Sequence, residues 1–197
     1  MAPPDLIAQA AAAAGRQGPP TSDYDLNPSR PAAAGLRAAA VLLPMIEIGG
    51  TAQIYLTKRA SHLKSHPGQI ALPGGKVDAG DAGPEAAALR EASEEIGLPA
   101  GNVRILGRMA AHETVTGFSV TPVLGRVTAA FLPVPEAGEV EEVFTVPLSA
   151  VLDSGRYRIE GRFWRGEWRR YYCVPHGPYY IWGATARILK ALADRMG

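Results

Sequence analysis

The segment "GGKVDAGDAGPEAAALREASEEIGL", residues 74–98, concentrates negative charge over a short distance. Three of its glutamates, Glu91, Glu94 and Glu95, fall within five positions, and Arg90 is its only arginine. Like charges four residues apart on a helix repel by about 0.2–0.5 kcal/mol even in water. The sequence therefore carries an electrostatic cost here, and we expect another interaction to offset it.

A helix is predicted over residues 84–96. Residues 81–83 offer a cap, Pro84 suits the first helical turn, and Gly97 suits the position just after the last turn. The acidic cluster then lies in the last two turns of this helix.

Helical geometry places two of the acids on one face. Glu91 and Glu95 are four residues apart and lie beside an apolar arc that can be buried, made of Ala88, Leu89, Ala92 and Ile96. Arg90 can reach Glu94, also four residues away, but one cation cannot neutralise three carboxylates.

A bound divalent cation would offset the repulsion. Clustered carboxylates are hard oxygen ligands, which suit Mg²⁺ or Mn²⁺ better than Zn²⁺. The preceding "PGGK", residues 73–76, supplies glycines whose backbone can approach a phosphate or offer a carbonyl to the metal. A solvated acidic helix face is the alternative, and the nearby glycine loop disfavours it.

The segment resembles the Nudix box, G-x5-E-x7-R-E-U-x-E-E-x-G-U, in which U is aliphatic. Gly75 matches the opening glycine, Asp81 stands where the first glutamate belongs, and Ala92 is a small residue at a U position. One extra residue precedes the arginine, which leaves the role of Asp81 open. The remaining matches are Arg90, Glu91, Glu94, Glu95, Gly97 and Leu98.

Residues 55–98 as a whole resemble the coenzyme A pyrophosphatase branch of that family. The branch typically has L-T-x-R-[SA], a basic residue, H-x-G-Q and P-G-G. Lys64 replaces the usual arginine and Leu72 the usual phenylalanine, and lysine loses the bidentate geometry toward phosphate. The matches are Leu56, Thr57, Arg59, Ala60, Lys64, His66, Gly68, Gln69, Pro73, Gly74 and Gly75. Three later segments, residues 117–125, 141–148 and 181–189, also resemble this branch and extend the resemblance to about residues 37–190.

The resemblance implies hydrolysis of coenzyme A or acyl-CoA to 3′,5′-ADP and (acyl-)4′-phosphopantetheine, with Mg²⁺ or Mn²⁺. It implies Glu91 and Glu95 as the principal metal ligands, assisted by the Gly75 carbonyl. Glu94 would be a ligand through water or the general base, and Arg90 would orient the acids.

The substrate side of the site is expected on the preceding strand and loop. Arg59 and Lys64 could contact the diphosphate or the 3′-phosphate, His66 could touch phosphate or hydrogen-bond the backbone, and the Gly74 backbone could approach a phosphate. A later loop offers other candidates for the general base, namely Glu139, Glu141 and Glu142.

Two other functions stay open. One is a Nudix pyrophosphatase for another nucleoside diphosphate derivative or a nucleotide, such as ADP-ribose, a dinucleotide or a nucleoside triphosphate. The other is a Nudix-like nucleotide sensor without hydrolysis, which the intact Glu91, Glu94 and Glu95 disfavour.

Length and composition fit one domain of an ordinary globular protein. The 197 residues carry a net charge of +1, which argues against nucleic acid or a membrane as a partner. The single Cys173 excludes an internal disulfide framework and weakly favours a reducing, cytoplasmic compartment. We expect a monomer or homodimer acting on a small molecule.

The rest of the pattern predicts an α+β fold or a mixed-sheet sandwich, and the resemblance implies a Nudix-type α/β/α sandwich with a mixed sheet between helices. Residues 1–36 read as an N-terminal arm, with a helix at 4–14, and residues 37–197 as the Nudix domain. A hairpin is predicted over 38–59, a second over 155–177, and a C-terminal helix over 182–196. We expect five aromatic residues to line the core or a pocket, one of them able to stack on adenine: Trp164, Trp168, Tyr171, Tyr179 and Trp182.

Overall fold

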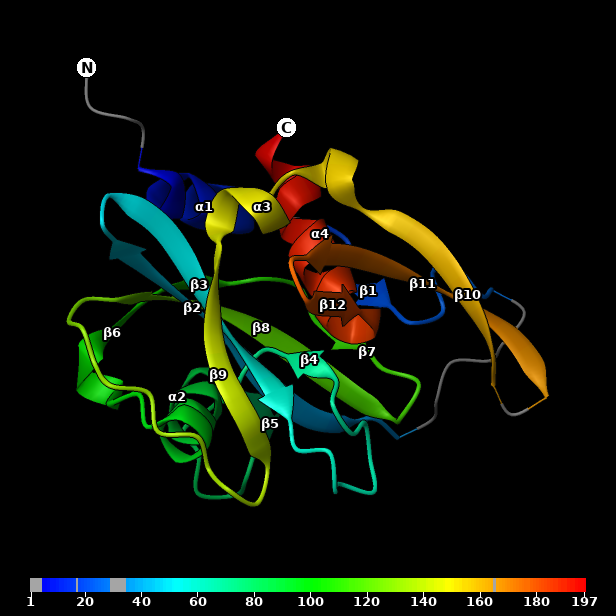
Figure 1. Cartoon of the computed structure of the whole chain (residues 1–197), viewed down its shortest axis with the longest axis horizontal. Helices are drawn as coiled ribbons and strands as arrows, with labels where there is room; N and C mark the ends of the chain where they lie inside the picture. The colour runs from blue at the N-terminus through cyan, green and yellow to red at the C-terminus, as the bar shows by residue number, and fades with distance from the viewer. Residues whose placement is uncertain (1–4, 17, 29–34, 165) are drawn as a thin grey trace.

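The computed structural model describes residues 5–16, 18–28, 35–164 and 166–197. The other positions of the predicted arm, 1–4, 17 and 29–34, lie outside the described residues, as does the side chain of Trp164. Figure 1 shows a mixed sheet with helices on both of its faces, as predicted.

Four long strands form the body of the main sheet. β2 (Arg37–Ile48) turns back at a Gly-Gly step into β3 (Thr51–Arg59), which confirms the predicted hairpin. β8 (Phe118–Val127) lies parallel to β2, and β9 (Val140–Pro147) runs antiparallel to β3. Shorter strands complete it: β1 (Thr21–Ser22), β4 (Ile70–Ala71), β5 (Gly74–Lys76), β6 (Val103–Arg108) and β7 (His112–Glu113).

Strict alternation along β2 separates two hydrophobic cores. Odd positions such as Leu43 and Met45 face one core, and even positions such as Leu42 and Ile46 face the other. A strand covered on both faces must be apolar on both, which explains the near-continuous apolar run of β2.

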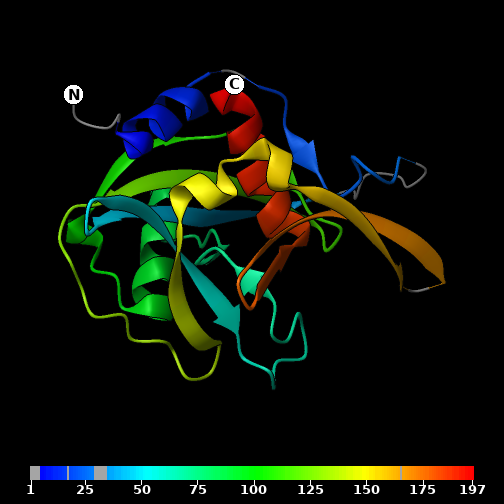
Figure 2. The ribbon, with the colours of Figure 1, turned by 45° about the horizontal axis from the view of Figure 1, so that its top comes forward.

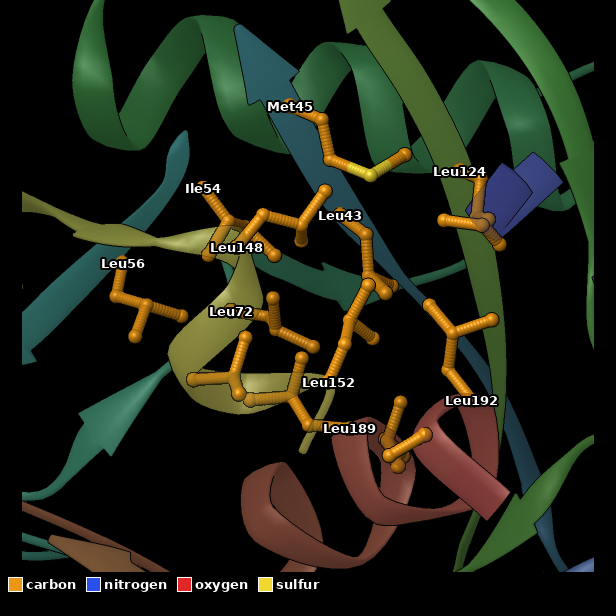
Figure 3. Packing of buried hydrophobic residues seen from close by; sticks show 14 of the residues in the cluster. Leu43, Met45, Ile54, Leu56, Leu72, Leu124, Leu148, Leu152, Leu189 and Leu192 are labelled. Atoms are coloured by element: carbon orange, nitrogen blue, oxygen red, sulfur yellow. The ribbon is translucent and has the colours of Figure 1, made fainter. Parts of the chain in front are cut away.

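Helices cover each face. α2 (Pro84–Ile96) packs on one face, while α1 (Leu6–Ala14), α3 (Leu148–Val151) and α4 (Gly183–Met196) cover the other, as Figure 2 shows. Leucines from β2, β3, α3 and α4 interdigitate in the larger core (Figure 3). Full burial of each such side chain stabilises the fold by about 1.5–3 kcal/mol.

A second, three-stranded sheet projects from this body (Figure 1). β10 (Arg158–Trp164) and β11 (Glu167–His176) form the predicted hairpin, and β12 (Tyr179–Trp182), which the sequence did not indicate, pairs with β11 and leads directly into α4. The two 3₁₀ turns are η1 (Ala100–Asn102) and η2 (Ser154–Arg156).

The N-terminal segment is packed onto the domain where it is described. α1 lies against α4 and buries Ile7 at 1% exposure. β1 pairs in parallel with β7, and the buried ring of His112 bonds to the Thr21 hydroxyl at 2.9 Å and to Asp23 at 3.2 Å. His112 is thus a structural residue that fastens this segment.

The aromatic prediction was partly wrong. Trp168 is 71% exposed at the end of the projecting hairpin, where its ring contacts Phe163. Tyr171 and Trp182 do line a cavity, and Tyr179 stacks on Phe144. Cys173 is a buried core thiol as expected. Alternation along a strand cannot reveal whether the strand extends beyond the body of the domain.

Candidate active site

Glu95 is the most buried acid of the cluster. It lies on the inner side of α2 at 6% exposure, and its Oε2 accepts a hydrogen bond from the Gly74 amide at 3.1 Å. The pKa of Glu95 is raised to about 7, chiefly by burial, with the nearby Glu91 and Glu139 adding to the rise and the Gly74 amide and Arg59 opposing it. A carboxylate in this position calls for a positive partner.

Glu91 faces the glycine turn of β5. A Cβ built on Gly75 would lie 2.5 Å from the Glu91 carboxyl group, so only glycine leaves this carboxylate its space. Gly74 has φ +156°, and a Cβ built on it would collide with the Ala40 carbonyl oxygen, which also excludes a side chain. Partial burial raises the pKa of Glu91. The absence of side chains at the two glycines therefore lets β5 lie directly against the acidic side chains of α2.

Arg90 holds the surrounding acids in place. Its guanidinium donates to both carboxylate oxygens of Asp81 at 3.1 Å and to the Lys76 carbonyl at 3.1 Å. It also donates to Glu91 at 3.0 Å and to Glu94 at 3.1 Å. The fork to Arg90 holds the pKa of Asp81 below its usual value.

The extra residue of the box is accommodated in a turn before α2. The amide of Asp78 donates to the Asp81 carboxylate at 2.8 Å, and the Asp81 amide donates to the Asp78 carbonyl at 3.0 Å. The cap of α2 is Gly83, with no side-chain capping bond, so Asp81 acts as the partner of Arg90 rather than as a helix cap.

The four candidate general bases lie in different places relative to the cavity beside the acidic helix. Glu141 is paired with Lys58 at 2.6 Å and with Ser61, which lowers its pKa, and Glu142 accepts the Tyr179 hydroxyl at 2.6 Å. The Glu94 side chain is 60% exposed and is not part of the cavity wall. Of the four candidates, Glu139 is the one on the wall.

Backbone bonds bring Glu139 to the acidic helix. The amide of Glu136 donates to the Glu95 carbonyl at 2.9 Å, which ties this loop to the end of α2. The Ala60 amide donates to the Glu139 carbonyl at 2.9 Å, which ties the same loop to the end of β3. No sequence motif marks Glu139, because its position depends on these long-range contacts.

A cavity of about 1690 Å³ opens beside these acids. Its wall includes all four residues predicted to bind substrate: Arg59, Lys64, His66 and Gly74. Arg59 Nε is buried with no hydrogen-bond partner among the described residues. His66 adopts a left-handed conformation with φ 55°, which is uncommon outside glycine. The end of β3 and the loop after it thus contribute the cations Arg59 and Lys64 to the wall of the cavity that Glu91 and Glu95 also line.

The donor set fits a hard divalent cation. Within the described ranges no three acid, histidine or cysteine side chains form a ready-made metal cluster. Mg²⁺ typically takes only one or two protein carboxylates and keeps waters and phosphate oxygens as its other ligands. Two partly buried, mutually repelling carboxylates next to a backbone turn match that requirement.

Comparison with known proteins identifies the same family that the sequence motif resembles. The NUDIX domain profile matches residues 36–167. A protein of Salmonella paratyphi B described as an uncharacterized Nudix hydrolase, NudL, is 42% identical over 161 residues, covering 82% of this chain and 83% of its own.

Solved structures agree on the fold. A Nudix hydrolase of M. smegmatis, RenU, matches with a TM-score of 0.50 and 30% identity over 58% of this chain and 73% of that one. A MutT protein from Methanosarcina mazei Go1 matches with a TM-score of 0.50 and 20% identity over 81% and 93%. This chain is a member of the Nudix family, hydrolases that act on phosphoric anhydrides and generally use divalent metal ions.

Proposed function

We propose that this Nudix hydrolase cleaves the diphosphate bond of coenzyme A or acyl-CoA, yielding 3′,5′-ADP and (acyl-)4′-phosphopantetheine. The observation that carries the proposal is the placement of the end of β3 and the loop after it. Arg59, Lys64 and His66 belong to the segment that resembles the coenzyme A branch, and they line the same cavity as Glu91 and Glu95.

Glu91 and Glu95, with the Gly75 carbonyl, would hold Mg²⁺ or Mn²⁺. Bound there, the ion supplies neutralisation of the diphosphate oxygens and makes water more acidic. Arg90 keeps Glu91 oriented through its 3.0 Å hydrogen bond while its fork to Asp81 anchors the guanidinium. Glu94 supports this arrangement from the solvent side.

The remaining residues act on substrate and water. Arg59 and Lys64 hold the diphosphate by charge. Glu139 accepts the proton of the attacking water at a carboxylate oxygen. The water oxygen forms a bond to phosphorus, the bridging P–O bond breaks, and its electrons leave with the departing phosphate. Glu139 is our choice among the candidate bases because it is on the cavity wall.

A substrate panel with Mg²⁺ or Mn²⁺ tests the proposal. Coenzyme A, acetyl-CoA, ADP-ribose, a dinucleoside polyphosphate and a nucleoside triphosphate are compared by kcat/KM, with products identified by mass. We expect the highest value for coenzyme A or its thioester, with 3′,5′-ADP as a product. A higher kcat/KM for ADP-ribose or a dinucleotide would instead establish the broader pyrophosphatase activity.

A further inference from the structure

The strand β10 is an open edge of the projecting sheet. That sheet has the order β10–β11–β12, so β10 has a neighbouring strand on one side only (Figure 1). Residues 158–163 are all exposed, and β10 pairs with β11 over its 7 residues without a bulge. Proteins ordinarily protect such an edge with a proline, a β-bulge, a covering segment or repelling charges. Among the described residues, β10 has no proline, bulge or cover, and its central charges, Glu160 and Arg162, are of opposite sign.

The direction of the backbone groups of β10 follows from its neighbour β11. The amide and the carbonyl of Arg170 bond to the side chain of Asn27, both at 2.9 Å, so they point away from β10. Arg170 lies opposite Gly161, and this pair is therefore of the non-hydrogen-bonded type, in which both residues direct their backbone groups away from each other. Because this direction alternates along a strand, Ile159, Gly161 and Phe163 direct their amides and carbonyls to the open edge.

In one antiparallel register this edge is complementary to the same edge of a second copy. A two-fold axis at Gly161 brings the two Gly161 residues opposite each other and Ile159 opposite Phe163 of the second copy. Every residue with outward backbone groups then faces another such residue. The same register places Glu160 opposite Arg162 of the second copy, in the type of pair whose side chains come closest. The edge therefore matches itself both in hydrogen bonding and in charge.

The neighbouring registers are unfavourable. An axis at residue 160 or 162 would place Glu160 opposite Glu160 or Arg162 opposite Arg162, and like charges directly opposite each other destabilise a sheet. A shift by one residue would place outward backbone groups opposite groups that already point toward β11, so that no ladder of hydrogen bonds could form. The charges and the backbone therefore select the same register.

An exposed apolar surface lies on one face of this hairpin. Ile159 is 46% exposed, Phe163 63% and Trp168 71%. The ring centroids of Phe163 and Trp168 are 6.2 Å apart, and a Cβ built on Gly161 would lie 3.6 Å from Trp168 Cε3. The indole therefore lies beside the position of the two-fold axis. Pairing would bring Phe163 against Ile159 of the second copy and remove apolar surface from water at both ends of the strand.

We propose that β10 binds β10 of a second copy of this chain, as a symmetric antiparallel pair centred on Gly161. The two three-stranded sheets then form one continuous sheet. One strand from each copy is a small contact, so the dimer dissociates on dilution. Pairing also brings a carboxylate of the second copy to Arg162, which lies over the Trp182 ring and lines the cavity. The inference does not depend on which substrate the enzyme cleaves.

Sedimentation equilibrium of the full-length protein between about 1 and 100 µM tests the pairing. We expect a reversible monomer–dimer equilibrium for the wild type. Glu160→Arg and Arg162→Glu each place like charges opposite each other on both sides of the axis, and each should weaken the dimer about tenfold or more. The double variant restores opposite charges in exchanged positions, so its dissociation constant should return to within about threefold of the wild-type value.

Gly161→Pro tests the backbone contribution. Proline removes the central amide, which points to the open edge and not toward β11, so the hairpin can keep its own ladder and the dimer should be lost. Glu47→Arg is the matched control, because it makes the same charge change at an exposed position of β2 and should dimerise as the wild type does. Circular dichroism confirms that each variant is folded.

Three results would overturn the pairing. The first is a wild-type protein that stays monomeric up to about 100 µM. The second is a dimer that survives Glu160→Arg, Arg162→Glu and Gly161→Pro alike, which would place the interface elsewhere. The third is a double variant that remains as weak as the two single variants, because the charges would then not face each other.

Discussion

Glu95 combines deep burial with a neighbouring carboxylate and a single backbone donor. Its 6% exposure and its pKa of about 7 reflect a carboxylate with too little solvation and too few partners. An arginine is at hand, but Arg90 is bound to the outer acids Asp81, Glu91 and Glu94. The inner carboxylate is therefore the one that gains most from a cation.

We predict that Glu95→Gln abolishes turnover while the protein stays folded. Loss of a metal ligand removes several kcal/mol of transition-state stabilisation, so kcat with Mg²⁺ should fall by about 10³-fold or more. The glutamine oxygen can still accept the Gly74 amide, so the melting temperature without metal should be retained. Steady-state kinetics and thermal unfolding with and without Mg²⁺ measure both effects.

The metal dependence of stability provides a second readout. Mg²⁺ that binds only the folded state should raise the melting temperature of the wild type and of Glu47→Gln, an exposed control on β2. The same addition should leave Glu95→Gln unchanged. If Glu95→Gln kept the wild-type turnover rate and the wild-type rise in melting temperature with Mg²⁺, Glu95 would not be a metal ligand.

At the scale of elements, the site depends on the close approach of β5 to α2. β5 pairs with β2 through Gly74 and Gly75, and α2 packs across the same strand. The box is therefore a strand and a helix held face to face, with the acids of the helix against the glycines of the strand.

Gly75→Ala tests this approach. Gly75 does not have positive φ, so alanine causes no backbone strain there, but its methyl group would meet the Glu91 carboxyl group at 2.5 Å. We predict that Glu91 is displaced and activity falls about 10–100-fold, as for other changes that misplace metal ligands, with little change in melting temperature. Gly80→Ala, which meets nothing within 4 Å, should keep full activity. Equal activity in the two variants would mean that the Glu91 position does not matter.

Long helices and strands could be predicted from the sequence, whereas the shortest strands could not. β2, β3 and α2 are long enough for a period to show, and all three were predicted close to their observed bounds. β4, β5 and β12 are too short to show a period and exist because neighbouring strands accept their hydrogen bonds. Those short strands are the ones that bring Gly74 to Glu95 and the start of α4 to the cavity.

At the scale of the whole molecule, the described part of the N-terminal segment belongs to the larger core. Ile7, Ala10, Ala13 and Ala14 are buried in it together with residues of α4. Asp5 caps α1 by accepting the Ala8 amide at 3.1 Å, and it pairs with Arg126 of β8. We propose that this segment is needed for stability of the domain.

Ile7→Ala should therefore lower the free energy of unfolding by about 2–4 kcal/mol, because it leaves a cavity at a fully buried site. Gln9→Ala, exposed on the same helix, should change it by less than about 0.5 kcal/mol. Urea unfolding at constant slope measures both. Equal stability of the two variants would show that α1 contributes nothing to the core.

The sequence by itself determined the acidic helix, its register, the glycines before it and the family, because these depend on residues close together in the chain. Only the tertiary structure decided which acid is buried, that Asp81 partners Arg90, and that Glu139 rather than Glu141 or Glu142 joins the cavity. It alone also brought Arg162 to the start of α4. Local spacing fixes which face of a helix a side chain occupies. The burial of that side chain and its hydrogen-bond partners depend on segments far apart in the sequence, which come together only in the folded structure.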